Sequence, residues 1–278
     1  MRIVITGCKG QLGQALQHAL AGEQLLGLDL PEWDMIDPAC IQTVVGFRPD
    51  VVIHLAAMTN VDACEREPEA AFRANVLGTH HMALACGQSG AAMVHVSTNE
   101  VFDGTLGRPY YEWDTPGPKS VYARSKAAAE FYVRTLLNRF YIVRTAWLYA
   151  QGGDNFVVKI LAAADRLGAL RVVTDEVSSP TYAPDLAQAI ARLIPTGHYG
   201  IYHLTNSGFC SRYEWACVIL KLAGRGHVPV EPITTDQWQR QAPPPLYAPL
   251  VNFAGAALGI TLRPWQEALQ EYFAGDGA

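Results

Sequence analysis

Long runs of one kind of residue are missing from this sequence, and each missing kind excludes a class of protein. No segment approaches the roughly 18 consecutive apolar residues of a membrane-spanning helix, so we expect no membrane partner. Clusters of lysine and arginine are also missing and the formal net charge is -5, which argues against binding to nucleic acid. We find no internal repeat, and no low-complexity tail beyond the terminal GDGA.

Metal-binding and secretion signals are missing too. The six cysteines are scattered, without a C-x-x-C pair or a cysteine/histidine cluster at zinc-binding spacing, so we expect reduced thiols and no metal site. The first residues, MRIVITGCKGQLG, hold only a short apolar run before glycine, which is too short for the core of a signal peptide. These features predict a cytoplasmic protein.

Up to residue 149, segments typical of buried strands alternate with segments typical of helices. Half of the 278 residues are hydrophobic and 17% are charged, which suits one large domain or two closely joined ones. Strands are expected at residues 2–6, 25–29, 49–57, 93–96 and 141–148. This alternation predicts an α/β fold with a Rossmann-type doubly wound parallel sheet.

From about residue 150 the pattern changes to loops, short strands and proline-rich segments. We expect a smaller C-terminal substrate-binding region that is interleaved with the sheet domain. Residues 1–149 are assigned to the dinucleotide-binding domain, with strands and a helix near residues 170–204 returning to it. Residues 150–169 and 205–278 are assigned to the substrate-binding region.

A glycine-rich turn follows the first expected strand. Gly7, Gly10 and Gly13 stand at G-x-x-G-x-x-G spacing directly before a helical segment. Glycine permits a tight turn, a close approach of the backbone to a pyrophosphate, and close packing of helix on strand. The helix N-terminus then offers free amides and a positive dipole end to the phosphates. We predict a dinucleotide site here, and a glycine turn without a ligand is the alternative.

Further cofactor contacts are expected at the ends of the next strands. Asp29 lies about twenty residues after the glycines, where a carboxylate can bind ribose hydroxyls and favour NADH. Lys9 would instead favour NADPH, so both cofactors stay open. Asp34 could contact the adenine edge or be a solvated carboxylate, and the small Ala56 and Ala57 would let a flat cofactor pass. The predicted cofactor site also includes Gln11, Leu12, Met35 and Thr59.

Tyr122 and Lys126 stand four residues apart in SVYARSKAAAEFYV, so a helix would present both on one face. A free tyrosine titrates near pH ~10, and a neighbouring cation lowers that pKa. Such a tyrosine can exchange a proton with a substrate oxygen, although Y-x-x-x-K also occurs on ordinary helix surfaces. Thr98 follows the expected strand MVHV, where its hydroxyl could bind a substrate carbonyl or simply end the strand.

With these features in this order, the chain resembles the extended short-chain dehydrogenase/reductases. More closely, it resembles the dTDP-4-dehydrorhamnose reductase family. The resemblance covers about two thirds of the chain, and its most specific segments are AAMTNVD, VRTAWLY and SPTYAPDLA. It implies an NAD(P)-dependent oxidoreductase that uses NADPH or NADH.

The implied reaction is reduction of the C4 keto group of a dTDP-4-keto-6-deoxy sugar, from dTDP-4-dehydrorhamnose to dTDP-L-rhamnose. By the resemblance, Tyr122 donates the proton, Lys126 lowers its pKa and binds the nicotinamide ribose, and Thr98 polarises the carbonyl. Tyr122 and Lys126 are thereby counted among the cofactor-binding residues as well. Contacts to the dTDP-sugar are expected from Asn99, Glu100, Trp147, Asn155 and Thr181.

One departure from the family pattern bears on the reaction. Members commonly read S-T-D-Y-V-F-D-G, whereas this chain has Asn99 and Glu100 in the middle. The segment S-T-N-E-V-F of this chain is thus intermediate between the family pattern and the T-D-E-V-Y of the nucleotide-sugar 4,6-dehydratases, in which the Asp and Glu act as acid and base for loss of water. An amide at Asn99 cannot protonate a leaving hydroxyl, so we place the reductase first. Glu100 leaves an epimerase-type step open, and Trp147, Asn155 and Thr181 could equally be packing residues.

Two alternatives remain. One is another nucleotide-sugar epimerase, 4,6-dehydratase or reductase on the same scaffold. The other is a non-catalytic regulatory subunit like that of methionine adenosyltransferase, against which the intact Thr98, Tyr122 and Lys126 argue. Some relatives form homodimers through a metal held by acidic residues, but no carboxylate here matches that role, so a homodimer and the exact sugar stay open.

Overall fold

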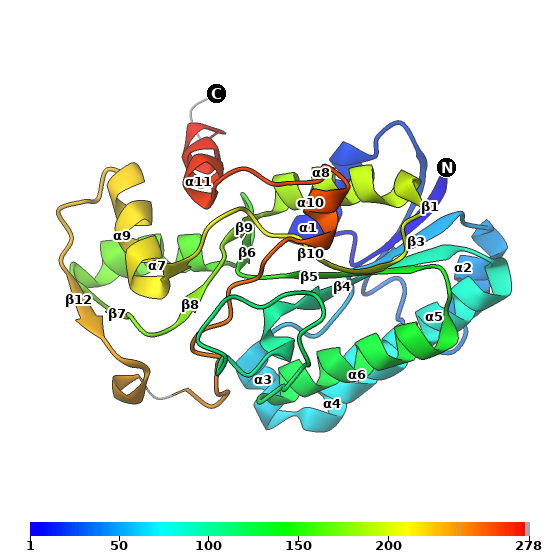
Figure 1. Ribbon diagram of the computed structural model, residues 1–278, viewed down its shortest axis with the longest axis horizontal. Coiled ribbons are helices and arrows are strands. Elements are labelled where there is room, and N and C mark those ends of the chain that lie inside the picture. Colours follow the sequence, from blue (N-terminus) through cyan, green and yellow to red (C-terminus); the bar gives the residue numbers. More distant parts are fainter. Residues whose placement is uncertain (239, 276–278) are drawn as a thin grey trace.

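The computed structural model describes residues 1–238 and 240–275, which form a main α/β lobe and a smaller lobe at one end (Figure 1). The main lobe contains a sheet of six parallel strands in the order β10-β5-β4-β3-β1-β2. Its strands are β1 (Arg2–Thr6), β2 (Gln24–Leu28), β3 (Val51–His54), β4 (Ala92–Thr98), β5 (Phe140–Thr145) and β10 (Gly200–His203). The strand order reverses between β1 and β3, so the sheet is doubly wound.

Helices cover both faces of this sheet (Figure 1). One face carries α1 (Gln11–Ala19), α8 (Ala183–Leu193) and the short α10 (Ala254–Ala257). The other carries α2 (Cys40–Phe47), α5 (Gly78–Ser89) and α6 (Val121–Leu136). Alternate residues of β1 show the two layers, because Ile3 and Ile5 pack with α1 whereas Val4 packs with α2. Burial on both faces explains the continuous apolar runs that predicted a parallel sheet.

Shorter helices connect these elements. Between β3 and α5 lie α3 (Val61–Arg66), α4 (Pro68–Phe72) and the π-helix η1 (Arg73–Leu77). Single 3-10 turns are η2 (Asn99–Val101), η3 (Ile194–Thr196) and η4 (Thr235–Gln237). η2 matters most for the site, since it follows β4 directly and turns residues 99 and 100 away from the strand.

The smaller lobe packs around Trp215, which is fully buried. Phe156 and Trp147 stack on it, with ring centroids 4.9 and 5.5 Å away. The lobe contains α7 (Phe156–Leu167), α9 (Arg212–Leu222) and α11 (Trp265–Ala274). Its strand pairs are β7 (Leu170–Val173) with β12 (Val230–Ile233), and β8 (Val177–Ser178) with β11 (Cys210–Ser211).

The two lobes are interleaved along the chain. β6 (Leu148–Tyr149) pairs with β9 (Thr181–Tyr182) where the lobes meet, and α8 and β10 then lie in the main lobe. The sequence analysis expected the strand near residue 170 to return to the main sheet, but β7 does not. It pairs with β12, and its Leu170 and Val172 are buried in the core of the smaller lobe. Residues 276–278, at the end of the expected substrate-binding region, lie outside the described residues.

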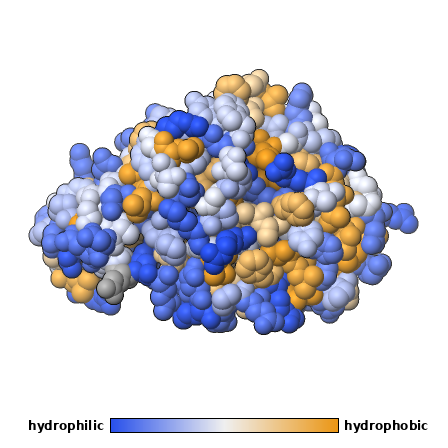
Figure 2. Space-filling model, turned by 60° about the horizontal axis from the view of Figure 1, so that its bottom comes forward, coloured by the Kyte–Doolittle hydropathy of each residue, from blue (hydrophilic) through white to orange (hydrophobic). Residues whose placement is uncertain are grey.

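The outer face of α6 carries exposed apolar side chains, namely Phe131, Tyr132 and Leu136. In Figure 2, where the lower face of Figure 1 comes forward, apolar areas lie among hydrophilic ones. None of the helices in the described part of the chain is long and apolar enough to cross a membrane. The homodimer that the sequence left open remains a prediction.

Candidate active site

A cleft of about 1000 Å³ opens at the carboxyl ends of β1, β3 and β4. It lies at the reversal of strand order, which is where open α/β sheets bind ligands. Most of the residues predicted from the sequence line it, but Asn155 and Thr181 are not among the lining residues. Those that line it are Gly7, Gly10, Gln11, Leu12, Gly13, Asp29, Asp34, Met35, Ala56, Ala57, Thr59, Thr98, Asn99, Glu100, Tyr122, Lys126 and Trp147.

Two glycines of the loop are required by its geometry. Gly7 has φ of +70°, and a Cβ on it would lie 2.8 Å from the backbone nitrogen of Ala56. A Cβ on Gly13 would lie 2.3 Å from the carbonyl oxygen of Gly7. Any side chain at either position would therefore displace backbone. The loop leads into the N-terminus of α1, whose free amides and positive dipole end suit a pyrophosphate.

Asp29, which favours NADH, and Lys9, which favours NADPH, lie together at one end of the cleft. The carboxylate of Asp29 accepts hydrogen bonds from the backbone nitrogens of Lys9 and Leu30, at 2.8 and 2.9 Å. The Lys9 ammonium forms an ion pair with Glu32 at 2.6 Å. Glu32, which the sequence did not single out, therefore competes with a ligand for the charge of Lys9. Asp34 accepts from the backbone nitrogen of Ile36 at 2.9 Å and thereby stabilises its own turn.

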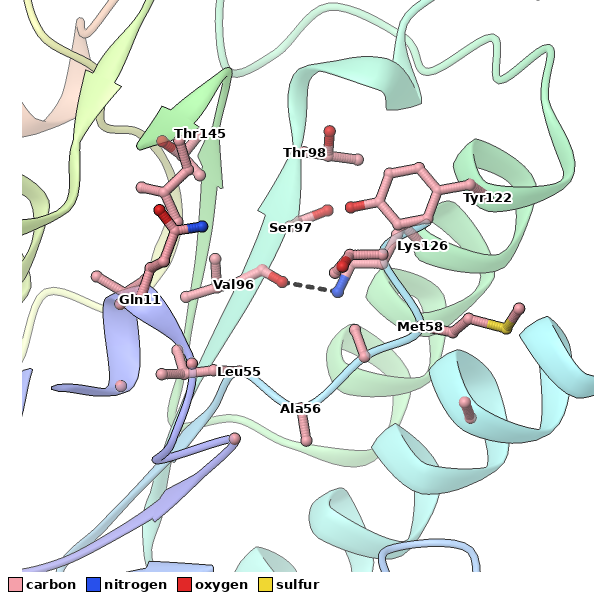
Figure 3. A pocket seen from close by; sticks show the side chains of 18 of the residues that line it. Gln11, Leu55, Ala56, Met58, Val96, Ser97, Thr98, Tyr122, Lys126 and Thr145 are labelled. Atoms are coloured by element: carbon pink, nitrogen blue, oxygen red, sulfur yellow. Dashed lines mark hydrogen bonds between the residues drawn. The ribbon is translucent and has the colours of Figure 1, made fainter. Parts of the chain in front are cut away.

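Helix α6 presents Tyr122, Lys126 and Glu130 on one face, at successive turns. Ser120 begins the helix by accepting a hydrogen bond from the backbone nitrogen of Ala123 at 3.0 Å. In Figure 3 the ring of Tyr122 and the ammonium of Lys126 point toward the end of β4, beside Ser97 and Thr98. Lys126 Nζ donates to the carbonyl oxygen of Val96 at 2.7 Å. The structure thus brings the tyrosine, the lysine and the strand-end hydroxyl together.

The electrostatics of this group differ from the expectation. Burial raises the pKa of Tyr122 above its ordinary value, the charge of Glu100 adds to the rise, and a hydrogen bond with Thr98 opposes it. Burial also lowers the pKa of Lys126 to about 8, with Glu130 opposing. The prediction that Lys126 lowers the pKa of Tyr122 is therefore wrong, since that pKa is raised. A buried ammonium and a buried phenol both lose solvation, and this disfavours the charged form of each.

A buried ion pair lies beneath the lysine, and the sequence analysis missed it. Arg144 on β5 donates from Nε and Nη2 to the two carboxylate oxygens of Glu130, at 2.9 and 2.7 Å. Ser97 donates to the same carboxylate at 2.6 Å. Both charged side chains are almost completely buried. The carboxylate therefore links α6, β4 and β5 below the cleft. In the sequence, the only signal for its position was the four-residue spacing of Tyr122, Lys126 and Glu130.

Residues 99 and 100 have separate surroundings. Asn99 donates from Nδ2 to Ser178 Oγ at 3.1 Å and to the carbonyl oxygen of Ala248 at 3.2 Å, so it ties the end of β4 to β8. Glu100 lines the cleft, and burial raises its pKa to about 7, with Glu176 adding to the shift and Arg240 and Arg212 opposing it. Its carboxyl group is therefore near the midpoint of its titration at neutral pH.

Trp147 and Arg212 form the wall of the cleft on the side of the smaller lobe. Trp147 has φ of +45°, in the left-handed region that non-glycine residues rarely adopt. The guanidinium of Arg212 lies 3.7 Å from the centre of its ring and donates to Glu176 at 3.0 Å. Strained residues of this kind are retained where surrounding contacts fix them, often at functional sites. The sequence pointed to Trp147 but not to Arg212, which comes from α9.

Asn155 and Thr181 lie between the lobes. Asn155 is the N-cap of α7, with Oδ1 accepting from the backbone nitrogen of Val158 at 3.2 Å. Thr181 is fully buried in β9, opposite Leu148. Neither residue is among those lining the cleft, and the contacts predicted from both to the sugar remain predictions. The described residues contain no group of three or more metal-ligating side chains, and all six cysteines are free thiols.

Replacing Glu100 with glutamine should stabilise the protein at pH 8 but not at pH 4. Below pH ~4.5 the carboxyl is protonated in both the folded and the unfolded state. Because its folded pKa is about 7, the folded protein retains a proton that the unfolded chain releases as pH rises from 4.5 to 7. Stability therefore falls across that window, by at most about 3 kcal/mol, and glutamine avoids this loss.

Urea unfolding of both proteins across this pH range would measure the effect. The exposed Glu69→Gln substitution serves as the control for removing a carboxylate. A difference between Glu100→Gln and wild type that stays the same at pH 4 and pH 8 would contradict the burial of a titrating carboxyl.

The sheet is doubly wound, and its cleft joins a glycine-rich dinucleotide loop to a tyrosine and a lysine on one helix face. This combination defines an oxidoreductase of the short-chain dehydrogenase/reductase type. Comparison with known proteins then gives the family. A family model described as RmlD substrate binding domain matches residues 1–276. The chain belongs to this family, that of the dTDP-4-dehydrorhamnose reductases.

Individual relatives match along nearly the whole chain. The spore coat polysaccharide biosynthesis protein SpsK of Bacillus subtilis is 38% identical, covering 98% of this chain and 96% of SpsK. The dTDP-4-dehydrorhamnose reductase of Mycobacterium tuberculosis is 40% identical, covering 96% of this chain and 91% of that protein. The Bacillus anthracis dTDP-4-dehydrorhamnose reductase, solved in complex with NADP, has a TM-score of 0.94 at 36% identity and 99% coverage of both chains. The predicted family, Rossmann-type fold and NAD(P)-dependent oxidoreductase class are confirmed.

Proposed function

We propose that this protein reduces the C4 keto group of dTDP-4-dehydrorhamnose to give dTDP-L-rhamnose, with a nicotinamide dinucleotide as hydride donor. The observation that carries the proposal is that a chain matching named reductases along its length also holds Thr98, Tyr122 and Lys126 together in the cleft. NADPH is the cofactor we propose first, because the Bacillus anthracis relative was solved with NADP.

The cofactor would lie along the glycine loop and the ends of β1 and β3. Gly7 and Gly13 leave no room for a side chain, because a Cβ on either would meet backbone atoms of the protein, and this keeps the loop tight against the start of α1. Asp29 and Lys9 would border the adenosine ribose, and Ala56 and Ala57 would lie along the dinucleotide. When bound, the nicotinamide supplies a hydride.

The protein's own part in the reaction is to position the carbonyl and to supply a proton. The raised pKa of Tyr122 keeps its phenol protonated at neutral pH, which suits a proton donor to the C4 oxygen. The Thr98 hydroxyl, hydrogen-bonded with Tyr122, would polarise the same oxygen. Lys126, with a pKa of about 8, would carry a positive charge in most molecules at pH 7 and would bind the nicotinamide ribose.

The sugar nucleotide would bind between the lobes. Glu100 and Trp147 line the cleft on this side and are the contacts we propose for the sugar. Asn99 is held by Ser178 and Ala248, so it would shape this part of the cleft. Its amide, already engaged as a donor, cannot provide the acid that a 4,6-dehydratase requires. The amide at this position, where the dehydratase has an acid, supports the reductase over the dehydratase.

The test is to incubate the protein with dTDP-4-keto-6-deoxy-L-mannose and either NADPH or NADH. We expect one equivalent of reduced cofactor to be consumed per sugar. A dehydratase or epimerase would recycle its cofactor without net consumption, and a regulatory subunit would consume none. If no cofactor is consumed, thermal-shift measurements with dTDP-, UDP- and GDP-sugars would identify the nucleotide that binds, because ligand binding stabilises the folded state.

A further inference from the structure

Gln11, in the dinucleotide loop, is held by a side chain from the smaller lobe. Gln11 is the first residue of α1 and lines the cleft. Asn155, at the start of α7, donates from Nδ2 to Gln11 Oε1 at 2.9 Å, although 144 residues separate the two in sequence. The neighbouring backbone packs on the same side chain, since a Cβ on Gly153 would lie 2.2 Å from Gln11 Cδ.

The main chain fixes the orientation of the Asn155 amide. Its Nδ2 also faces the carbonyl oxygens of Ala150 and Gly153, at 2.8 and 3.2 Å, and a carbonyl oxygen can only accept. Its Oδ1 accepts from the backbone nitrogen of Val158. Asn155 must therefore present its NH₂ group to Gln11. Gln11 responds with its oxygen, which leaves the Nε2 nitrogen directed toward the cleft, as Figure 3 shows.

We propose that Asn155 is a positioning residue for the cofactor. It holds the Gln11 amide so that Nε2–H, and not Oε1, faces the pyrophosphate of the bound dinucleotide. An anion at the N-terminus of a helix favours donors and is repelled by a carbonyl oxygen, so the orientation of this one amide affects binding. This role replaces the sugar contact that the family resemblance implied for Asn155. It rests on the use of a dinucleotide in the proposed function, but not on the identity of the sugar.

The Asn155→Asp substitution tests the orientation directly. Aspartate keeps the acceptor that caps α7, because Asp and Asn are similarly good N-caps, but it cannot donate to Gln11 or to the carbonyl oxygens of Ala150 and Gly153. The Gln11 amide should then turn its NH₂ group toward the new carboxylate and its oxygen toward the pyrophosphate. We expect NADP⁺ to bind roughly 10-fold more weakly, as measured by isothermal titration calorimetry without any sugar.

A double-mutant cycle separates this role from a purely structural one. Gln11→Ala removes the amide that Asn155 orients, so adding Asn155→Asp to Gln11→Ala should cause little further loss of NADP⁺ affinity. Equal losses in both backgrounds would overturn the proposal, as would unchanged affinity in the Asn155→Asp protein. Asn252→Asp is the matched control, because Asn252 also donates to a backbone carbonyl, that of Ile260, and is not among the residues lining the cleft.

Two outcomes could be confused with this result, and each is distinguishable. If Asn155→Asp fails to fold, Asn155→Ser keeps a good N-cap without the NH₂ group and should weaken NADP⁺ binding to a smaller extent, and unchanged affinity in this variant would overturn the proposal. Because NADP⁺ binding is measured directly, a protein that binds NADP⁺ but turns over no dTDP-sugar would contradict the proposed reaction and leave the role of Asn155 intact.

Discussion

Replacing Tyr122 with phenylalanine will lower kcat by about 100- to 10,000-fold while NADP⁺ affinity stays close to that of the wild type. The substitution removes one hydroxyl, the proposed proton donor, and leaves the partly buried ring in place. Because the pKa of Tyr122 is raised, its hydroxyl is protonated throughout the neutral pH range and can donate the proton there, which phenylalanine cannot do. Steady-state turnover with NADPH, together with calorimetric NADP⁺ binding, measures both parts of the prediction.

Tyr132→Phe is the matched control for this experiment. Tyr132 belongs to the same helix but is partly exposed on its outer side. The centroid of its ring lies 5.0 Å from that of the His80 ring. Removing its hydroxyl should change kcat less than 2-fold, about the scale of surface substitutions. If Tyr122→Phe retained most of the wild-type kcat, a different group would have to donate the proton, and Glu100 would be the first to examine.

Replacing Glu130 with alanine should destabilise the folded protein by about 3–5 kcal/mol. The change leaves the guanidinium of Arg144 buried without its counter-charge and removes the acceptor of Ser97. An unpaired buried charge is costly because neither water nor another group replaces its lost solvation. Urea unfolding at neutral pH would show the effect as a lower transition midpoint.

An exposed ion pair provides the comparison. Asp165 pairs with Arg225 through both carboxylate oxygens, at 2.6 and 2.9 Å, but its side chain is 56% exposed. Asp165→Ala should cost less than about 1 kcal/mol. If Glu130→Ala cost no more than Asp165→Ala, the buried pair would have no special weight. The double substitution Glu130→Leu with Arg144→Met should recover part of the stability, because it removes both buried charges.

The parts of the site that the sequence predicted depend on local geometry. Gly7 and Gly13 could be recognised because a tight turn between a strand and a helix excludes side chains. Tyr122 and Lys126 could be placed on one face because helical spacing is fixed over four residues. The alternation of apolar strands and helices likewise predicted the doubly wound sheet, since the inner strands β1, β3, β4 and β5 are buried on both faces.

The parts that the sequence did not predict depend on contacts between distant segments. Arg144 meets Glu130 because α6 packs on β4, where Ser97 also contacts the carboxylate, and because Ser97 is paired with Arg144 of β5. The pKa values of Tyr122 and Lys126 depend on how deeply the finished fold buries them, which a four-residue spacing does not specify. Asn155 could be recognised locally as the cap of a helix, but its partner Gln11 lies 144 residues away in the sequence.

The path of the chain between the lobes limits how a scaffold of this kind can change its sugar. α8 and β10 complete the main lobe, yet the segments before and after them in sequence belong to the smaller lobe. A contiguous block carrying the smaller lobe would thus include the edge strand of the main sheet and a helix that covers it. Exchange of such a block between homologous genes would disrupt the cofactor domain, so we expect new specificities to arise through separate substitutions in the smaller lobe.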